Sequence, residues 1–99
     1  MNYTEIFLGG NKVEVLEKTL EMRGMQRREI VSYFISVNEK NIVGGKFFGE
    51  GWEVYINEEV IIELGALRIP STTVIFHGKK EGLDKVILEF RLKFLTAGG

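Results

Sequence analysis

Short runs rich in apolar and aromatic residues, cut apart by glycine, occupy the middle of the chain and constrain its fold most. Residues 42–48 and 52–56 are two such runs, and Gly49-Glu50-Gly51 separates them. β-Branched and aromatic residues favour strands, and glycine permits the tight reversals between strands. We therefore expect these runs to pair in an antiparallel sheet, with a further strand at 72–77.

The flanking segments extend this sheet. Residues 30–37 alternate with a period of two, which predicts a strand joined to 42–48 through a turn at 38–41. A short strand is expected at 3–8. From 60 to 69 the pattern is less regular, because Gly65 interrupts an apolar stretch and suggests a bulge or bend that Pro70 closes.

Residues 11–23 predict the first helix. Asn11 fits the N-cap position with Glu14 three residues later, and Leu16 and Leu20 are spaced for one helical face. Gly24 follows as the expected stop, because glycine readily adopts the left-handed conformation that ends helices.

The segment 81–95 fits two structures. As a helix it places Leu83, Ile87 and Phe90 on one face; as a strand it alternates Val86, Leu88 and Phe90 with Ile87, Glu89 and Arg91. Fifteen residues exceed the usual strand of about 5–6, and Leu, Glu, Lys and Arg favour helices. We therefore expect a helix.

These elements predict one α+β domain over residues 1–99. It has a single antiparallel sheet of about five to six strands with two helices packed on one face, in the order β-α-β-β-β-β-(β)-α. The alternative is a ubiquitin-like β-grasp fold, which would apply if 81–95 were a strand.

Composition excludes several classes of function. The chain has no cysteine, which removes thiol nucleophiles, zinc ribbons and iron–sulfur clusters. The single histidine, His77, falls at the end of a predicted strand, where we favour a structural or solvent-facing role. A net charge of -1 provides no attraction to nucleic acid or to anionic membranes. We expect a cytoplasmic protein that is not an enzyme and holds no metal or cofactor.

Two glycine motifs are candidate sites. Gly98 and Gly99 are what a ubiquitin-like sulfur carrier presents to an adenylating enzyme, although Gly98 could equally be the residue that ends the last helix. Gly9-Gly10-Asn11 precedes the predicted first helix, so its backbone N–H groups could bind an anion such as a pterin phosphate. A tight strand-to-helix turn would also use these two glycines.

Three segments carry a resemblance to a known family: residues 51–54, 64–70 and 90–99. They read Gly-Trp-Glu-Val, Leu-Gly-Ala-Leu-Arg-Ile-Pro and Phe-Arg-Leu-Lys-Phe-Leu-Thr-Ala-Gly-Gly. Together they resemble the small carboxyl-terminal domain of proteins related to the small subunit of molybdopterin synthase (MoaD). That resemblance implies a TATA-binding-protein-like α+β fold and an association with molybdenum or tungsten pterin cofactor assembly, without catalytic residues.

Three functions from different classes follow. The preferred one is a non-catalytic accessory or binding module linked to pterin cofactor biosynthesis, which works through a sheet face, an edge or a helix surface. The second is a sulfur carrier that uses Gly99. The third is a homo-oligomeric structural protein without a small ligand. The expected partners are a protein or a second copy of the chain, with a pterin or an adenylating enzyme as further candidates.

Overall fold

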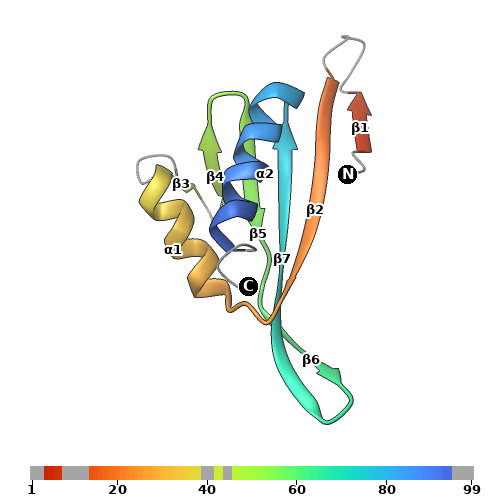
Figure 1. The fold of residues 1–99 in the computed structure, drawn as a ribbon. Helices are drawn as coiled ribbons and strands as arrows, with labels where there is room; N and C mark the ends of the chain where they lie inside the picture. The colour runs from red at the N-terminus through yellow and green to blue at the C-terminus, as the bar shows by residue number, and fades with distance from the viewer. Residues whose placement is uncertain (1–3, 8–13, 39–41, 44–45, 95–99) are drawn as a thin grey trace.

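The computed structural model describes residues 4–7, 14–38, 42–43 and 46–94. It shows an antiparallel sheet with two helices on one face, which confirms the predicted α+β class (Figure 1). The elements are β1 (Thr4–Phe7), β2 (Glu14–Arg23), α1 (Arg27–Asn38), β3 (Ile42–Val43), β4 (Lys46–Gly49), β5 (Trp52–Ile56), β6 (Val60–Leu64), β7 (Leu67–Gly78) and α2 (Lys80–Phe94). The order across the sheet is β1-β2-β7-β5-β4-β3, and β6 pairs with β7 alone.

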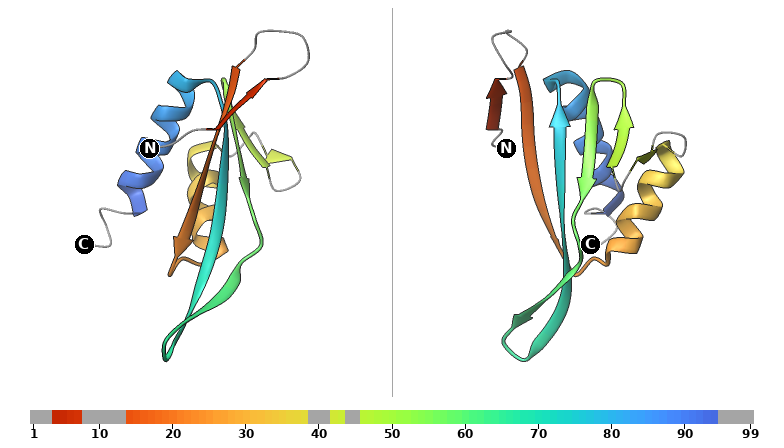
Figure 2. Two further views of the ribbon diagram at one scale, coloured as in Figure 1. Left: turned by 90° about the vertical axis from the view of Figure 1, so that its right-hand side faces the viewer. Right: turned by 180° about the vertical axis from the view of Figure 1, so that it is seen from behind.

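The core lies between the sheet and the two helices. In β2 and β7 alternate side chains face the helices, and β5 adds Val54 and Ile56 to the same layer. Figure 2 shows both helices on one side of the sheet, with no described element over its other face. The buried apolar residues are Leu16, Met22, Ile30, Phe34, Phe47, Val54, Ile56, Val74, Phe76, Leu83, Ile87 and Phe90.

The prediction of a helix at 11–23 is wrong from residue 14 onward, because Glu14–Arg23 is strand β2. Leu16 and Leu20 fit a period of two as well as a helical period, and the strand also turns Met22 into the core. β2 pairs with β7 from Leu16 to Arg23. This long pairing outweighs helix propensities that differ by only a few tenths of a kcal/mol per residue.

The prediction of a strand at 30–37 is also wrong, since these residues form α1. Ile30 and Phe34, four residues apart, are buried, whereas Val37 is exposed. The Glu29 carboxylate accepts a hydrogen bond from the backbone N–H of Gln26 at 3.0 Å, which caps the start of the helix. The alternation in residues 30–37 comes from β-branched and aromatic residues that lie in a helix.

The second half of the chain follows the sequence more closely. Residues 80–94 form α2, so the helix prediction is confirmed and the strand alternative is wrong. The β-grasp fold that depended on that strand is therefore not supported. Gly65, with φ +62, lies in the turn between β6 and β7. Pro70 does not close the segment but lies inside β7, on the stretch that pairs only with β6, where a missing N–H is tolerated.

Candidate functional site

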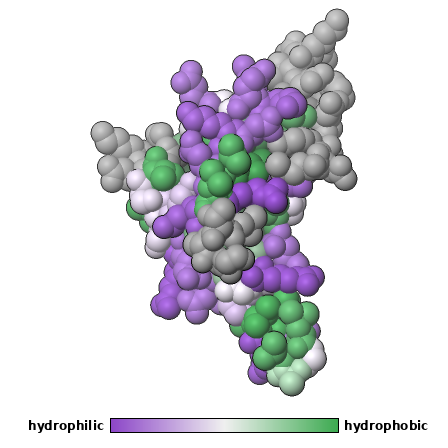
Figure 3. Space-filling view, viewed as in Figure 1, coloured by the Kyte–Doolittle hydropathy of each residue, from purple (hydrophilic) through white to green (hydrophobic). Residues whose placement is uncertain are grey.

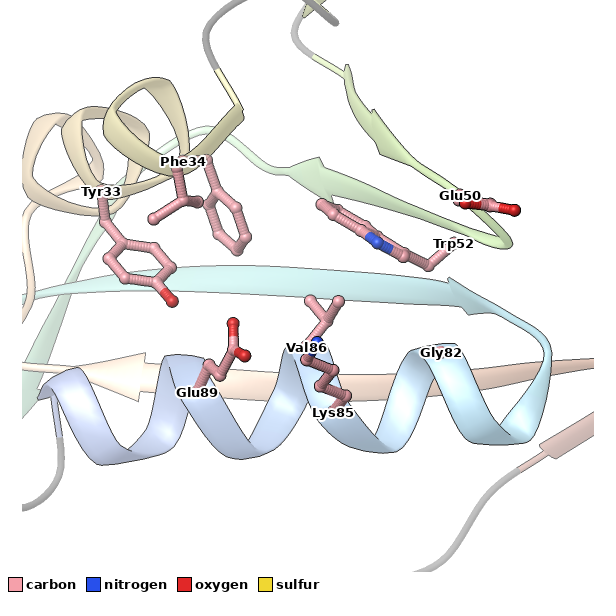
Figure 4. A pocket seen from close by; sticks show the side chains of 9 residues that line it. Tyr33, Phe34, Glu50, Trp52, Gly82, Lys85, Val86 and Glu89 are labelled. Atoms are coloured by element: carbon pink, nitrogen blue, oxygen red, sulfur yellow. The ribbon is translucent and has the colours of Figure 1, made fainter.

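A cleft of about 350 Å³ opens between α1, α2 and the turn that joins β4 to β5 (Figure 4). Its volume lies within the range of about 300–1,000 Å³ that is usual for small-molecule sites. Each helix contributes residues from one of its faces, because side chains three or four positions apart lie above one another. The lining residues are Tyr33, Phe34 and Val37 from α1, Glu50 and Trp52 from the hairpin, and Gly82, Lys85, Val86 and Glu89 from α2.

The cleft has an apolar floor and a charged rim. Phe34 is buried, and its ring stacks on that of Phe90 with centroids 5.5 Å apart, so the floor belongs to the packed core. Trp52 and Val86 are half-buried beside it. At the rim, Glu50, Lys85 and Glu89 are exposed and give the lining a net charge of one negative unit. This arrangement suits a flat apolar ligand with polar edges.

Trp52 occupies a fixed place in the cleft wall. It pairs with Gly49 across the β4–β5 hairpin, and its indole lies against the Gly49 backbone, where a side chain would overlap it. Gly49 therefore permits the close approach that holds the ring in position. Trp52 is also the single tryptophan of the chain, so tryptophan fluorescence comes from the wall of this cleft.

Tyr33 and Glu89 form the polar end of the cleft. Figure 4 shows the Tyr33 hydroxyl and the Glu89 carboxylate pointing toward each other, while Glu50 points away. Burial, and then the negative charge of Glu89, raise the pKa of Tyr33 above its ordinary value of 10.0. The hydroxyl therefore stays protonated at neutral pH, where it can donate a hydrogen bond while Glu89 accepts one.

A second polar cluster lies on the uncovered face of the sheet. His77 Nε2 lies 2.8 Å from Glu17 Oε1 on β2, and His77 Nδ1 lies 3.5 Å from Glu53 Oε1 on β5. These contacts join neighbouring strands, which agrees with the strand-end position predicted for His77. No group of histidine and acidic side chains in the described part of the chain is arranged to hold a metal ion.

The structure does not describe the candidate site residues that the sequence suggested. Gly9, Gly10 and Asn11 fall outside the described residues, and so do Gly98 and Gly99. The anion-binding hypothesis depended on a helix after Asn11, but residues 14–23 form a strand, so the positive end of a helix is not available there.

The cleft could not be predicted from the sequence while residues 30–37 were expected to form a strand, because a strand places Tyr33 and Phe34 on opposite faces. A usable signal existed in Ile30 and Phe34, which have helical spacing directly after Glu29, a residue suited to the first turn. The approach of α1 to α2 had no local signal, since it depends on packing between segments far apart in the sequence.

Comparisons with known proteins give one finding. A family model described as "Archaeal MoaD-like protein" matches residues 18–99. No curated protein and no solved structure shows a significant match. The matched segment covers most of the chain and runs from within β2 to the last residue. Among the helices of the described residues, none is long and apolar enough to cross a membrane.

Proposed function

The chain belongs to the family of archaeal MoaD-like proteins, and we propose that it is a non-catalytic accessory protein of molybdenum or tungsten pterin cofactor biosynthesis. In this proposal it binds the ring of a pterin in the cleft between α1 and α2. Membership of the family supports the link to pterin cofactor biosynthesis, and the cleft supports the binding of a pterin ring. The TATA-binding-protein-like fold and the cytoplasmic location belong to the same proposal.

The observation that carries the proposal is the pairing of an aromatic wall with a carboxylate at one end of the cleft. A pterin is a planar bicyclic ring whose pyrimidine edge carries adjacent N–H donors. Trp52 offers a face on which such a ring can stack, and the two oxygens of Glu89 can accept two parallel N–H bonds. The Tyr33 hydroxyl can donate to an acceptor on the same edge.

The charge of the lining selects which end of a ligand enters. Glu50 and Glu89 outnumber Lys85, so a phosphate group is repelled and the ring enters first. The proposal assigns the cleft binding rather than catalysis, through the aromatic and carboxylate side chains of its lining.

Titration with a pterin tests the proposal directly. We expect saturable quenching of Trp52 fluorescence, checked by calorimetry because pterins absorb near the emission of tryptophan. Glu89→Gln keeps the shape of the side chain but removes the charged acceptor, and we expect binding to weaken about 10- to 100-fold. Glu63→Gln on β6, where the carboxylate is also exposed, is the matched control and should bind like the wild type. Wild-type protein without saturable binding, or Glu89→Gln with unchanged affinity, contradicts the proposal.

The competing proposal is a sulfur carrier that uses Gly99. It is supported by the family match, which includes Gly98 and Gly99. Intact-mass measurement of protein isolated from its native cell distinguishes the two, because a carrier shows replacement of one carboxylate oxygen by sulfur. The carrier proposal is contradicted if no such replacement is found and if deletion of Gly99 leaves cofactor production unchanged.

A further inference from the structure

The β6–β7 ribbon extends beyond the rest of the sheet. The last pair between β2 and β7 joins Arg23 to Ser71, and beyond it residues 67–70 of β7 pair with β6 alone. Figure 1 shows this two-stranded ribbon projecting below the body, and the molecule measures 50 Å along its longest axis against 28 and 27 Å across. An isolated ribbon of this kind is marginally stable in water unless something packs on it.

One face of the ribbon exposes only apolar side chains. Residues opposite each other in an antiparallel pair project to the same face, so the register assigns each side chain to a face. Val60 is 54% exposed, Leu64 42% and Leu67 65%, whereas Ser71, opposite Val60 at the base of this face, is buried. Figure 3 shows the hydrophobic tip of the ribbon. The apolar face, as we call it below, consists of Val60, Ile62, Leu64, Leu67 and Ile69.

The opposite face of the ribbon is mixed. It carries the charged pair Glu63 and Arg68, with Arg68 Nε 3.7 Å from Glu63 Oε1, beside the apolar Ile61 and Pro70. The Glu63 and Arg68 side chains are mostly exposed. Covering this face would remove two charged side chains from water, whereas covering the apolar face removes only apolar surface.

We propose that a second copy of this chain covers the apolar face, with two ribbons stacked face to face about a two-fold axis. This inference goes beyond the proposed ligand-binding function and does not depend on it. The face exposes neither charged nor hydrogen-bonding side chains, since Ser71 at its base is buried, so it offers a charged partner nothing to pair with. It is complementary to itself, and a two-fold contact requires only one such patch on each copy.

Charge and size agree with this occupant. Antiparallel stacking puts the base of one ribbon against the tip of the other, so Glu58 and Glu59 at the base of each copy stay apart. A ribbon with strands of five residues is about 17 Å long and about 10 Å wide. This footprint of about 170 Å² per copy is far smaller than a standard interface, which buries about 1,600 Å² in total, so we expect a weak and reversible dimer.

Sedimentation of the full chain across about 5 to 500 µM tests the proposal, a range chosen for a dimer of micromolar affinity. We expect the average mass of the wild type to rise from monomer to dimer. Val60→Glu puts a charge on the apolar face and should weaken dimerisation at least about 100-fold. Ile61→Glu is the matched control: Ile61 is the next residue, is 53% exposed, and projects to the opposite face.

The three outcomes are decisive. A concentration-dependent dimer that Val60→Glu abolishes and Ile61→Glu preserves supports the proposal. A wild type that stays monomeric overturns it, even if another protein binds the ribbon, and so does equal loss of dimer in both variants. Leu67→Glu repeats the test at the other strand, and circular dichroism checks that each variant is folded. Because the readout is mass without a pterin, failure here is distinct from failure of ligand binding.

Discussion

The fit of Trp52 against Gly49 makes a quantitative prediction for Gly49→Ala. A Cβ atom at residue 49 would lie well under 3.0 Å from the indole Cε2, Nε1 and Cζ2. Carbon atoms in contact are normally about 3.5–4.0 Å apart, so the ring must leave its position. Trp52 lies at the start of β5 and is only half-buried, so its ring can move outward without unfolding the core.

The expected loss of stability is that of a locally overpacked site, about 1–3 kcal/mol. A chain of this length has on the order of 5–15 kcal/mol of stability, so the variant stays folded. Its urea midpoint should fall by about 1 M. The tryptophan emission of the folded protein should shift to longer wavelength, because the displaced indole is more exposed to water. Pterin binding should weaken with the loss of the cleft wall.

Gly51→Ala is the control that separates displacement of Trp52 from general destabilisation. Gly51 has φ +81, which costs an alanine about 1–2 kcal/mol, but a Cβ there meets nothing within 4 Å. Gly51→Ala should therefore lower stability to a similar extent without changing the emission of the folded protein. If Gly49→Ala keeps the wild-type emission, or if both variants shift it equally, the proposed role of Gly49 is refuted.

Three further predictions concern the core and the rim of the cleft. Phe90→Ala should cost about 3–5 kcal/mol in denaturant unfolding, since the ring is fully buried among four other rings. Thr72→Val should cost about 1–2 kcal/mol by the same assay, because the buried Thr72 hydroxyl donates to the Met25 carbonyl at 3.0 Å. The pKa of Tyr33 is raised in the folded protein, so the folded state holds the Tyr33 proton more tightly than the unfolded chain does. The resulting stability is fully present below pH 10.0, where both states keep the proton, and is lost as pH rises through the pKa of the folded state. Glu89→Gln should lower that pKa in a spectrophotometric titration, and an unchanged pKa contradicts the assigned cause.

The fold class could be predicted because its strongest signals are local. Gly49-Glu50-Gly51 separates two apolar runs, and the strands β4 and β5 on either side of it pair with Phe47 opposite Val54. The first run differs from the prediction in part, since Ile42–Val43 forms the separate strand β3. The length and composition of residues 80–94 favoured the helix that is observed. In both cases propensity, periodicity and tertiary packing favour the same structure.

The two misassigned elements failed where a local signal was ambiguous. Leu16 and Leu20 satisfy a period of four or of two, and only the pairing with β7 decides between them. In α1 the alternation of β-branched and aromatic residues was accidental, and the packing of Phe34 on Phe90 decides in favour of a helix. Both decisions depend on partners more than 50 residues away in the sequence, which a local pattern does not contain.

The sequence predicts the two proposed sites to different degrees, because one depends on a local pattern and the other on packing between distant segments. The apolar face of the ribbon follows from the apolar residues on both sides of Gly65, once a hairpin is assumed there. The cleft requires α1 to be a helix and to lie beside α2, which depends on tertiary packing.

The two proposed sites lie at opposite ends of the sheet, because the chain passes from Trp52 at the cleft through β5 to Val60 at the base of the ribbon. Face-to-face stacking of two ribbons therefore leaves both clefts open, and each copy of a dimer keeps its own site for a ligand.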